Sequence, residues 1–333
     1  MNNKHPEVKY GKTGILLINL GTPDSTGWWD IRKYLKEFLS DRRVIEVNPF
    51  IWKIILNLFI LTFRPSNTAK AYKEIWMKDK NMSPLRHYTI MQSQKLSEKL
   101  NNKNKIVEYA MRYGSPSIRS KIDELKDKGC ENLVILPLYP QYAAATTATV
   151  CDEVYKTLMQ MRWQPSLQII PHYESEPLYI KALAKSIQKK LSKINLKPDL
   201  IIESYHGIPK KYFDKGDPYQ CYCQKTSRLL SESYTDIKIM TTFQYRFGPQ
   251  EWLQPYTDKT LESLPNEGVK NLLVICPGFS SDCVETLEEI SIQGKESFLK
   301  AGGLNFDTVP CLNDDPDHID LLNHLVNKYI INS

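Results

Sequence analysis

The chain has 333 residues, of which 41% are hydrophobic and 25% are charged, and its formal net charge is +6. This composition is ordinary for a globular protein, and the length favours two domains over one small core. The basic residues are scattered rather than clustered with aromatic residues, so nucleic-acid binding is not expected.

The chain begins with a polar segment, residues 1–11, that lacks the apolar core of a secretory signal. The seven cysteines are an odd number and are widely spaced. We therefore expect reduced thiols and a cytoplasmic protein.

Apolar runs typical of strands then alternate with amphipathic runs typical of helices. Helical patterns cover, for example, residues 178–191 and 280–300. This alternation predicts an α/β protein with mostly parallel sheets. The eight predicted strands are 14–20, 106–111, 132–138, 167–170, 199–204, 237–243, 270–276 and 306–309.

The longest apolar run covers residues 50–63 and is interrupted by Lys53 and Asn57. It is shorter than the ~18–20 residues that a membrane-spanning helix needs. Turns are expected on both sides of it, at Asn48–Pro49 and Arg64–Pro65. Two interpretations stay open: a buried helix, or an exposed apolar lip that touches lipid or an apolar ligand.

Two segments of the chain resemble each other. Residues 129–137 match residues 268–276 at a constant offset of 139 residues, and each segment is followed by a loop with an aromatic residue. Four predicted strands fall in each half, which indicates two similar doubly wound domains, 1–172 and 173–333, with four-stranded parallel sheets and a cleft between them. Chance convergence on a common strand–helix pattern is the alternative.

An imidazole and a carboxylate follow two of the predicted strands in the second half. His206 lies just after the apolar residues 200–202, and Glu285 lies in the run after 271–275. Ligands of open parallel sheets bind at the carboxyl ends of the strands, so these two side chains are expected to face one cleft. The pair can hold a metal ion, accept protons, or do both.

Seven stretches spread over the chain together resemble the ferrochelatase family, in the form found in Gram-negative bacteria. The resemblance implies two Rossmann-like, chelatase-type domains and the insertion of Fe²⁺ into protoporphyrin IX, the last step of heme synthesis. The stretches are 18–23, 111–114, 138–142 with Thr146 and Thr147, 204–209, 216–219, 243–249 with Trp252 and Leu253, and 277–289.

The resemblance implies that His206 is the base or metal ligand and that Glu285 is its partner ligand. Glu285 and Glu289 are four residues apart and share one helix face, where like charges repel unless a cation or protons visit. Glu289 is therefore the expected next station of a proton relay, whereas Glu288 is expected to face solvent. Asp282 is expected either to cap the helix or to orient His206.

The resemblance also places Arg112 and Tyr113 beside the porphyrin, with Arg112 supplying a charge for a propionate or a proton path. Leu20, Trp252 and Phe279 are the expected walls of the substrate slot.

The 50–63 run matches the lip at the mouth of the family's pocket. Because protoporphyrin is poorly soluble, we expect contact with a membrane surface here, and a cytoplasmic protein that can be peripheral to the inner membrane.

No cofactor is expected to be required, because Fe²⁺ is a substrate. Some family members carry a [2Fe–2S] cluster, but the position matching their internal ligand is Ala144, and no cysteine follows Cys311. Cys221 and Cys223 form the one close pair, and with Cys151 or Cys283 they are a low-probability cluster site.

The alternatives from neighbouring classes are a chelatase for coproporphyrin or cobalt and a non-catalytic porphyrin carrier. A carrier needs no relay, so the presence of His206, Glu285 and Glu289 argues against it.

Overall fold

The computed structural model describes residues 9–194, 197–234 and 237–330, so part of the polar segment 1–11 lies outside the described residues. Two parallel four-stranded sheets organise the described chain, in the orders β2-β1-β3-β4 and β6-β5-β7-β8. The strands are β1 (Lys12–Gly21), β2 (Lys105–Tyr113), β3 (Cys130–Pro137), β4 (Ser166–Ile169), β5 (Leu200–His206), β6 (Ile239–Gln244), β7 (Asn271–Ile275) and β8 (Asn305–Thr308).

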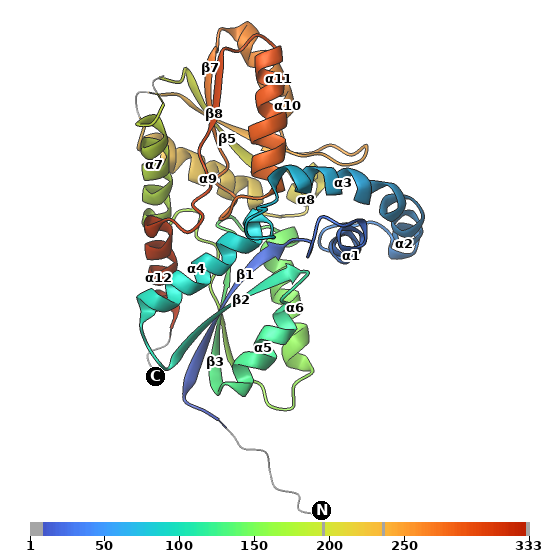
Figure 1. Ribbon diagram of the computed structural model, residues 1–333, viewed down its shortest axis with the longest axis vertical. Coiled ribbons are helices and arrows are strands. Elements are labelled where there is room, and N and C mark those ends of the chain that lie inside the picture. The colour runs from blue at the N-terminus through green and yellow to red at the C-terminus, as the bar shows by residue number, and fades with distance from the viewer. Residues whose placement is uncertain (1–8, 195–196, 235–236, 331–333) are drawn as a thin grey trace, which may run out of the picture.

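Helical segments connect successive strands and cover both sheets (Figure 1). The α-helices are α1 (Trp28–Leu39), α2 (Pro49–Ile55), α3 (Leu61–Ile75), α4 (Pro84–Leu100), α5 (Ile118–Asp127), α6 (Thr149–Met159), α7 (Pro177–Leu191), α8 (Lys210–Asp214), α9 (Tyr219–Glu232), α10 (Thr257–Ser263), α11 (Lys295–Lys300) and α12 (Pro316–Tyr329). The π-helices are η1 (Leu56–Ile60), η2 (Ala144–Ala148) and η4 (Glu285–Gly294), and η3 (Leu264–Glu267) is a 3₁₀-helix.

The internal resemblance reflects a structural repeat. β3 and β7, which contain the matching segments, occupy the same third position in their sheets. All eight strands predicted from sequence are present, with ends displaced by at most a few residues. The prediction of two parallel four-stranded sheets is therefore confirmed. β1, β3 and β7, which lie inside the sheets, contain continuous buried apolar runs, as expected where helices cover both faces.

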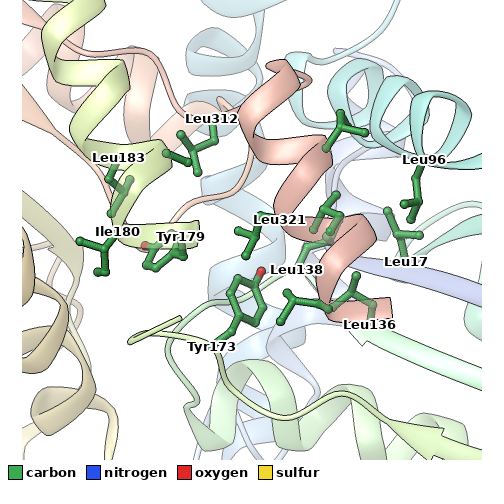
Figure 2. Packing of buried hydrophobic residues seen from close by; sticks show 14 of the residues in the cluster. Leu17, Leu96, Leu136, Leu138, Tyr173, Tyr179, Ile180, Leu183, Leu312 and Leu321 are labelled. Atoms are coloured by element: carbon green, nitrogen blue, oxygen red, sulfur yellow. The ribbon is translucent and has the colours of Figure 1, made fainter. Parts of the chain in front are cut away.

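The two halves share one large core. The cluster in Figure 2 joins Leu17 and Leu136 of the first sheet region to Leu183 of α7 and Leu321 of α12. α12 packs against both α7 and α4, so the last described helix lies on the first half of the chain. The boundary at 172/173 stays a prediction, because the packing of α12 crosses it.

A buried glutamine also ties the halves together. The Gln92 side-chain nitrogen on α4 donates to the Ser280 carbonyl at 3.2 Å, the Ser281 hydroxyl at 3.0 Å and the Asn313 carbonyl at 2.8 Å. Because Ser280 and Ser281 belong to the loop that leads into η4, this contact fixes the start of η4 against the first half.

The 50–63 run forms α2, η1 and the start of α3, and it projects from the first half (Figure 1). The interpretation as a buried helix is wrong, because most of the apolar side chains of this run are exposed. The turn expected at Arg64–Pro65 is wrong, since Pro65 lies inside α3. It is the fifth residue of that helix, so its missing N–H removes a single hydrogen bond near the helix start. The apolar lip residues Phe50, Ile51, Ile54, Leu58, Phe59 and Phe63 expose between 46% and 75% of their surface.

One buried carboxyl in β5 makes stability depend on pH. Glu203 is fully buried; one of its oxygens accepts from Tyr205 at 3.1 Å and from the Ser227 hydroxyl, and the other has no partner among the described residues. Burial raises the pKa of Glu203 from 4.5 to about 7. The folded state thus keeps a proton that the unfolded state releases, and stability is lost as the pH rises from the unfolded to the folded pKa.

We expect Glu203→Gln to be more stable than the wild type at pH 8 by about 3 kcal/mol and to match it at pH 4. The amide keeps the size of the protonated carboxyl and carries no charge at any pH. Urea unfolding of both proteins at the two pH values measures the difference. An equal pH dependence of the two proteins would show that Glu203 does not titrate as described.

Candidate active site

A cavity of about 520 Å³ lies between the two halves and is walled mainly by apolar groups. This size suits a small organic ligand. Its lining comes from the carboxyl ends of strands in both sheets, from α1 and from the lip. Six of the residues predicted from sequence line it: Leu20, His206, Trp252, Phe279, Glu285 and Glu289.

His206 is the last residue of β5 and pairs with Gln244 of the neighbouring β6. The next residue packs closely against the end of β6, which requires Gly207: a Cβ atom there would lie 3.0 Å from the carbonyl oxygens of both Gln244 and Tyr245. The His206 ring stacks on Tyr245, with 5.1 Å between ring centroids. Strand end, glycine and aromatic ring together fix the imidazole at the cavity wall.

The hydrogen bonding of His206 determines which nitrogen is free. Nδ1 lies 2.7 Å from the Gly207 carbonyl oxygen, which can only accept, so Nδ1 carries the hydrogen and the neutral ring keeps a lone pair on Nε2. Burial lowers the pKa of His206 below its usual range, and the negative charge of Glu285 opposes this shift only in part. The ring is therefore neutral near pH 7 and able to accept a proton or bind a metal.

Glu285 is the first residue of η4, as predicted, and Glu289 lies one turn further along the same helix. The Gln244 side-chain nitrogen donates to the Glu285 carbonyl at 2.8 Å and lies 3.5 Å from the Glu289 carboxyl. Burial, followed by the charges of Glu285 and Glu288, raises the pKa of Glu289 to about 8. Glu289 is thus protonated at pH 7 and can donate a proton.

The structure corrects the expectation that Glu288 faces solvent. Glu288 is half-buried and lines the cavity, where it accepts a hydrogen bond from the Gln293 side chain at 2.7 Å. The physical reason is that a π-helix brings residues five apart together, whereas the expectation assumed α-helical spacing.

Neither of the two roles left open for Asp282 is observed among its hydrogen bonds in the described chain, since no backbone N–H of the first turn of η4 donates to its side chain. Its carboxylate accepts from the Thr286 hydroxyl at 3.2 Å, the Cys311 backbone at 3.2 Å and the Asn313 side chain at 2.7 Å. His206 is not among its hydrogen-bond partners in the described chain. Asp282 therefore secures the first turn of η4 to the segment before α12.

Arg112 and Tyr113 are placed differently from the expectation, since neither lines the cavity. The Arg112 guanidinium donates to Asp41 at 2.5 Å, and the Tyr113 hydroxyl donates to the same carboxylate at 3.0 Å. Phe38, which does line the cavity, packs edge-on against Tyr113 with 5.1 Å between centroids. Arg112 forms an ion pair with Asp41 and does not line the cavity. It therefore supports the cavity wall at Tyr113 and Phe38 from outside.

Arg64 lines the cavity and was not predicted from the sequence. Arg64 donates to the Tyr245 hydroxyl and lies 5.3 Å from the centroid of Phe247. The sequence predicted a turn at Arg64. Because α3 continues through Pro65, Arg64 instead lies two helical turns before Tyr72, which also lines the cavity.

The close cysteine pair does not face one point. Cys221 is exposed, whereas Cys223 is fully buried, and burial raises the pKa of Cys223 well above its usual range. Among residues 9–194, 197–234 and 237–330, no three histidine, cysteine or acidic side chains form a group suited to a metal ion. The expected absence of an iron–sulfur cluster stays a prediction.

Comparison with known proteins places this chain in a family. A model of the family described as Ferrochelatase matches residues 12–330. Curated relatives named Ferrochelatase include those of Allorhizobium ampelinum strain S4 (54% identity, covering 98% of this chain and 96% of the relative), Rhizobium meliloti (54%; 98% and 97%) and Francisella tularensis subsp. novicida (51%; 97% and 97%).

Solved structures agree on the fold. SirB from Bacillus subtilis with Fe³⁺ matches with a TM-score of 0.57 at 11% identity, over 95% of both chains. The sirohydrochlorin chelatase SirB from Bacillus subtilis subspecies spizizenii in complex with cobalt matches with a TM-score of 0.54 at 9% identity, over 95% of this chain and 94% of that one. At such low identity these likenesses concern the fold alone.

Proposed function

The chain belongs to the ferrochelatase family and is an enzyme that inserts ferrous iron into protoporphyrin IX in heme synthesis, and we propose that His206 and Glu285 receive the metal and the pyrrole protons. Insertion requires a base, a ligand for the incoming dication and a slot that holds the macrocycle. The observation that carries the proposal is the free Nε2 of a neutral His206 in the same cavity as Glu285.

In this proposal His206 acts on the substrate through the lone pair of its Nε2. The neutral imidazole accepts a pyrrole proton or binds Fe²⁺, and the Nδ1 hydrogen bond to Gly207 keeps the ring in the required tautomer. The stacked Tyr245 ring keeps the imidazole plane fixed.

Glu285 supplies the charge that Fe²⁺ requires, and Glu289 passes protons onward. A group with a pKa of about 8 holds a proton at pH 7 and exchanges it readily, so Glu289 suits a relay station better than a ligand. Gln244 bridges the two positions through its side-chain amide.

Protoporphyrin fits the cavity by apolar contact. Leu20, Phe38, Trp252 and Phe279 contribute walls, and Arg64 is a cation at the lip side that can pair with a propionate. Because Fe²⁺ enters without changing oxidation state, the reaction requires no redox cofactor.

We expect the enzyme to prefer protoporphyrin over coproporphyrin, which carries four carboxylates instead of two. Arg64 and Lys211 are the cations of the described lining, and Glu46, Glu285, Glu288 and Glu289 are its acids. Two further carboxylates would be buried without partners, so kcat/KM should fall by at least ~10-fold. Anaerobic assays with Fe²⁺ and each porphyrin, followed by absorbance, measure this ratio. A ratio near one would contradict the substrate assignment.

The lip is proposed as a contact with a membrane surface, which would make the enzyme a cytoplasmic protein peripheral to the inner membrane. No helix within the described ranges is long and apolar enough to span a bilayer. Exposed Phe50, Phe59 and Phe63 beside the cavity mouth instead suit shallow insertion among lipid headgroups, from which the apolar substrate can enter.

We expect Ile54→Ser combined with Leu58→Ser to weaken binding to vesicles of anionic phospholipid by at least ~10-fold and to raise the KM for vesicle-borne protoporphyrin. The two side chains are 46% and 63% exposed, so the melting temperature should stay within about 2 °C of the wild type.

The matched control is Met159→Ser with Leu304→Ser, which removes two apolar side chains that are 80% and 68% exposed and lie outside the lip, and which should leave both measurements unchanged. A large fall in melting temperature with an unchanged KM would show that the lip segment is ordinary core.

A further inference from the structure

A second, very small cavity lies behind Glu285. Its volume is about 10 Å³, and its polar lining includes Tyr34 of α1, Tyr72 of α3, Ser83 before α4, Cys283 and Glu285. A cavity of about this size holds one water molecule, provided that it offers two to four polar partners.

Two buried phenols converge on this point. Tyr34 and Tyr72 are 7% and 5% exposed, and their rings pack edge-on with 6.5 Å between centroids. Both phenols line this cavity together with Glu285. Burial raises the pKa of both hydroxyls well above the usual range, and the negative charge of Glu285 adds to the shift in both. The hydroxyls are therefore always protonated and able to donate.

A third buried hydroxyl lies at this place. Thr22, directly after β1, is 1% exposed, and its hydroxyl lies beside that of Tyr72.

We propose that this cavity holds one ordered water that joins the Tyr34 and Tyr72 hydroxyls to the Glu285 carboxylate, and that the two tyrosines are positioning residues for the metal-binding glutamate. The inference rests on the proposed role of Glu285 as an iron ligand. One carboxylate oxygen is held from behind by the water, which leaves the other directed into the large cavity that His206 also lines.

Such outer contacts have a defined effect. A ligand whose orientation is fixed by hydrogen bonds binds metal more tightly than one that rotates freely, and losing such contacts typically weakens metal binding by about 10- to 100-fold. Because both tyrosine rings also line the large cavity, phenylalanine is the informative replacement: it keeps the ring and removes only the hydroxyl.

The test compares Zn²⁺ binding to the full-length enzyme without porphyrin, measured by calorimetry, for the wild type, Tyr34→Phe, Tyr72→Phe and the double variant. We expect the double variant to bind Zn²⁺ at least ~10-fold more weakly and to show a raised KM for Fe²⁺ with an unchanged KM for protoporphyrin. Tyr173→Phe is the matched control, because Tyr173 is a buried tyrosine without a hydroxyl partner in the described chain, lies in the shared core of Figure 2 and does not line either cavity.

Glu285→Gln separates the inference from the function on which it rests. If Glu285→Gln leaves Zn²⁺ binding unchanged, both the proposed role of Glu285 and the inference that rests on it are wrong. If Glu285→Gln weakens Zn²⁺ binding but the double tyrosine variant behaves like Tyr173→Phe, only the inference is overturned. A rise in the KM for protoporphyrin alone would also overturn it, since the tyrosines would then be substrate walls.

Discussion

Replacing His206 by alanine is expected to lower kcat for iron insertion by at least ~10²-fold while protoporphyrin still binds. The substitution removes the free Nε2 of His206, which is a neutral base in the cavity. Turnover is measured anaerobically with Fe²⁺, and porphyrin binding by the change in its absorbance.

Two controls sharpen this experiment. His172→Ala removes a partly exposed histidine that does not line the cavity, so its kcat should match that of the wild type. Added imidazole should restore part of the activity of His206→Ala, because it can occupy the space next to Tyr245. A variant with near-normal turnover would exclude His206 from the mechanism.

Glu285→Gln is expected to lose activity to a similar extent with its fold intact, because the amide keeps the size of the side chain but carries no charge for Fe²⁺. Glu289→Gln should be milder, at about 10-fold, since a protonated carboxyl and an amide are alike until a proton has to move. Both effects are read from kcat, and thermal unfolding serves as the control.

The two glutamates also make a linked prediction. Since the charge of Glu285 contributes to the raised pKa of Glu289, Glu285→Gln should lower that pKa from about 8. Infrared titration of the carboxyl band measures it. An unchanged pKa, or a collapse of thermal stability together with activity, would mean that Glu285 has a structural role and that the relay is unsupported.

What could be predicted from sequence follows from local physics. Buried parallel strands are continuous apolar runs, so their positions and the repeat between residues 129–137 and 268–276 were readable. The rule that ligands bind at the carboxyl ends of strands then brought His206 and Glu285 to one cavity. Both predictions depend on patterns a few residues long.

What could not be predicted depends on contacts between distant segments. Arg112 lies at the end of a strand like His206, yet it binds Asp41, which is 71 residues away, and its neighbour Tyr113 packs behind Phe38. The place of Glu288 depended on a π-helical turn, which has no clear sequence signature. Glu203 carries a raised pKa only because the fold buries it.

The packing of α12 on the first half has a consequence for synthesis on the ribosome. Leu17 of β1 and Leu96 of α4 belong to the same core as Leu321 and Leu325 of α12, so part of the core of the first half is completed by residues translated long after it. At typical elongation rates α12 emerges roughly 10–40 s after α4. During that interval the nascent chain presents an apolar surface that is open to chaperones and to aggregation, and the packing of α12 closes it.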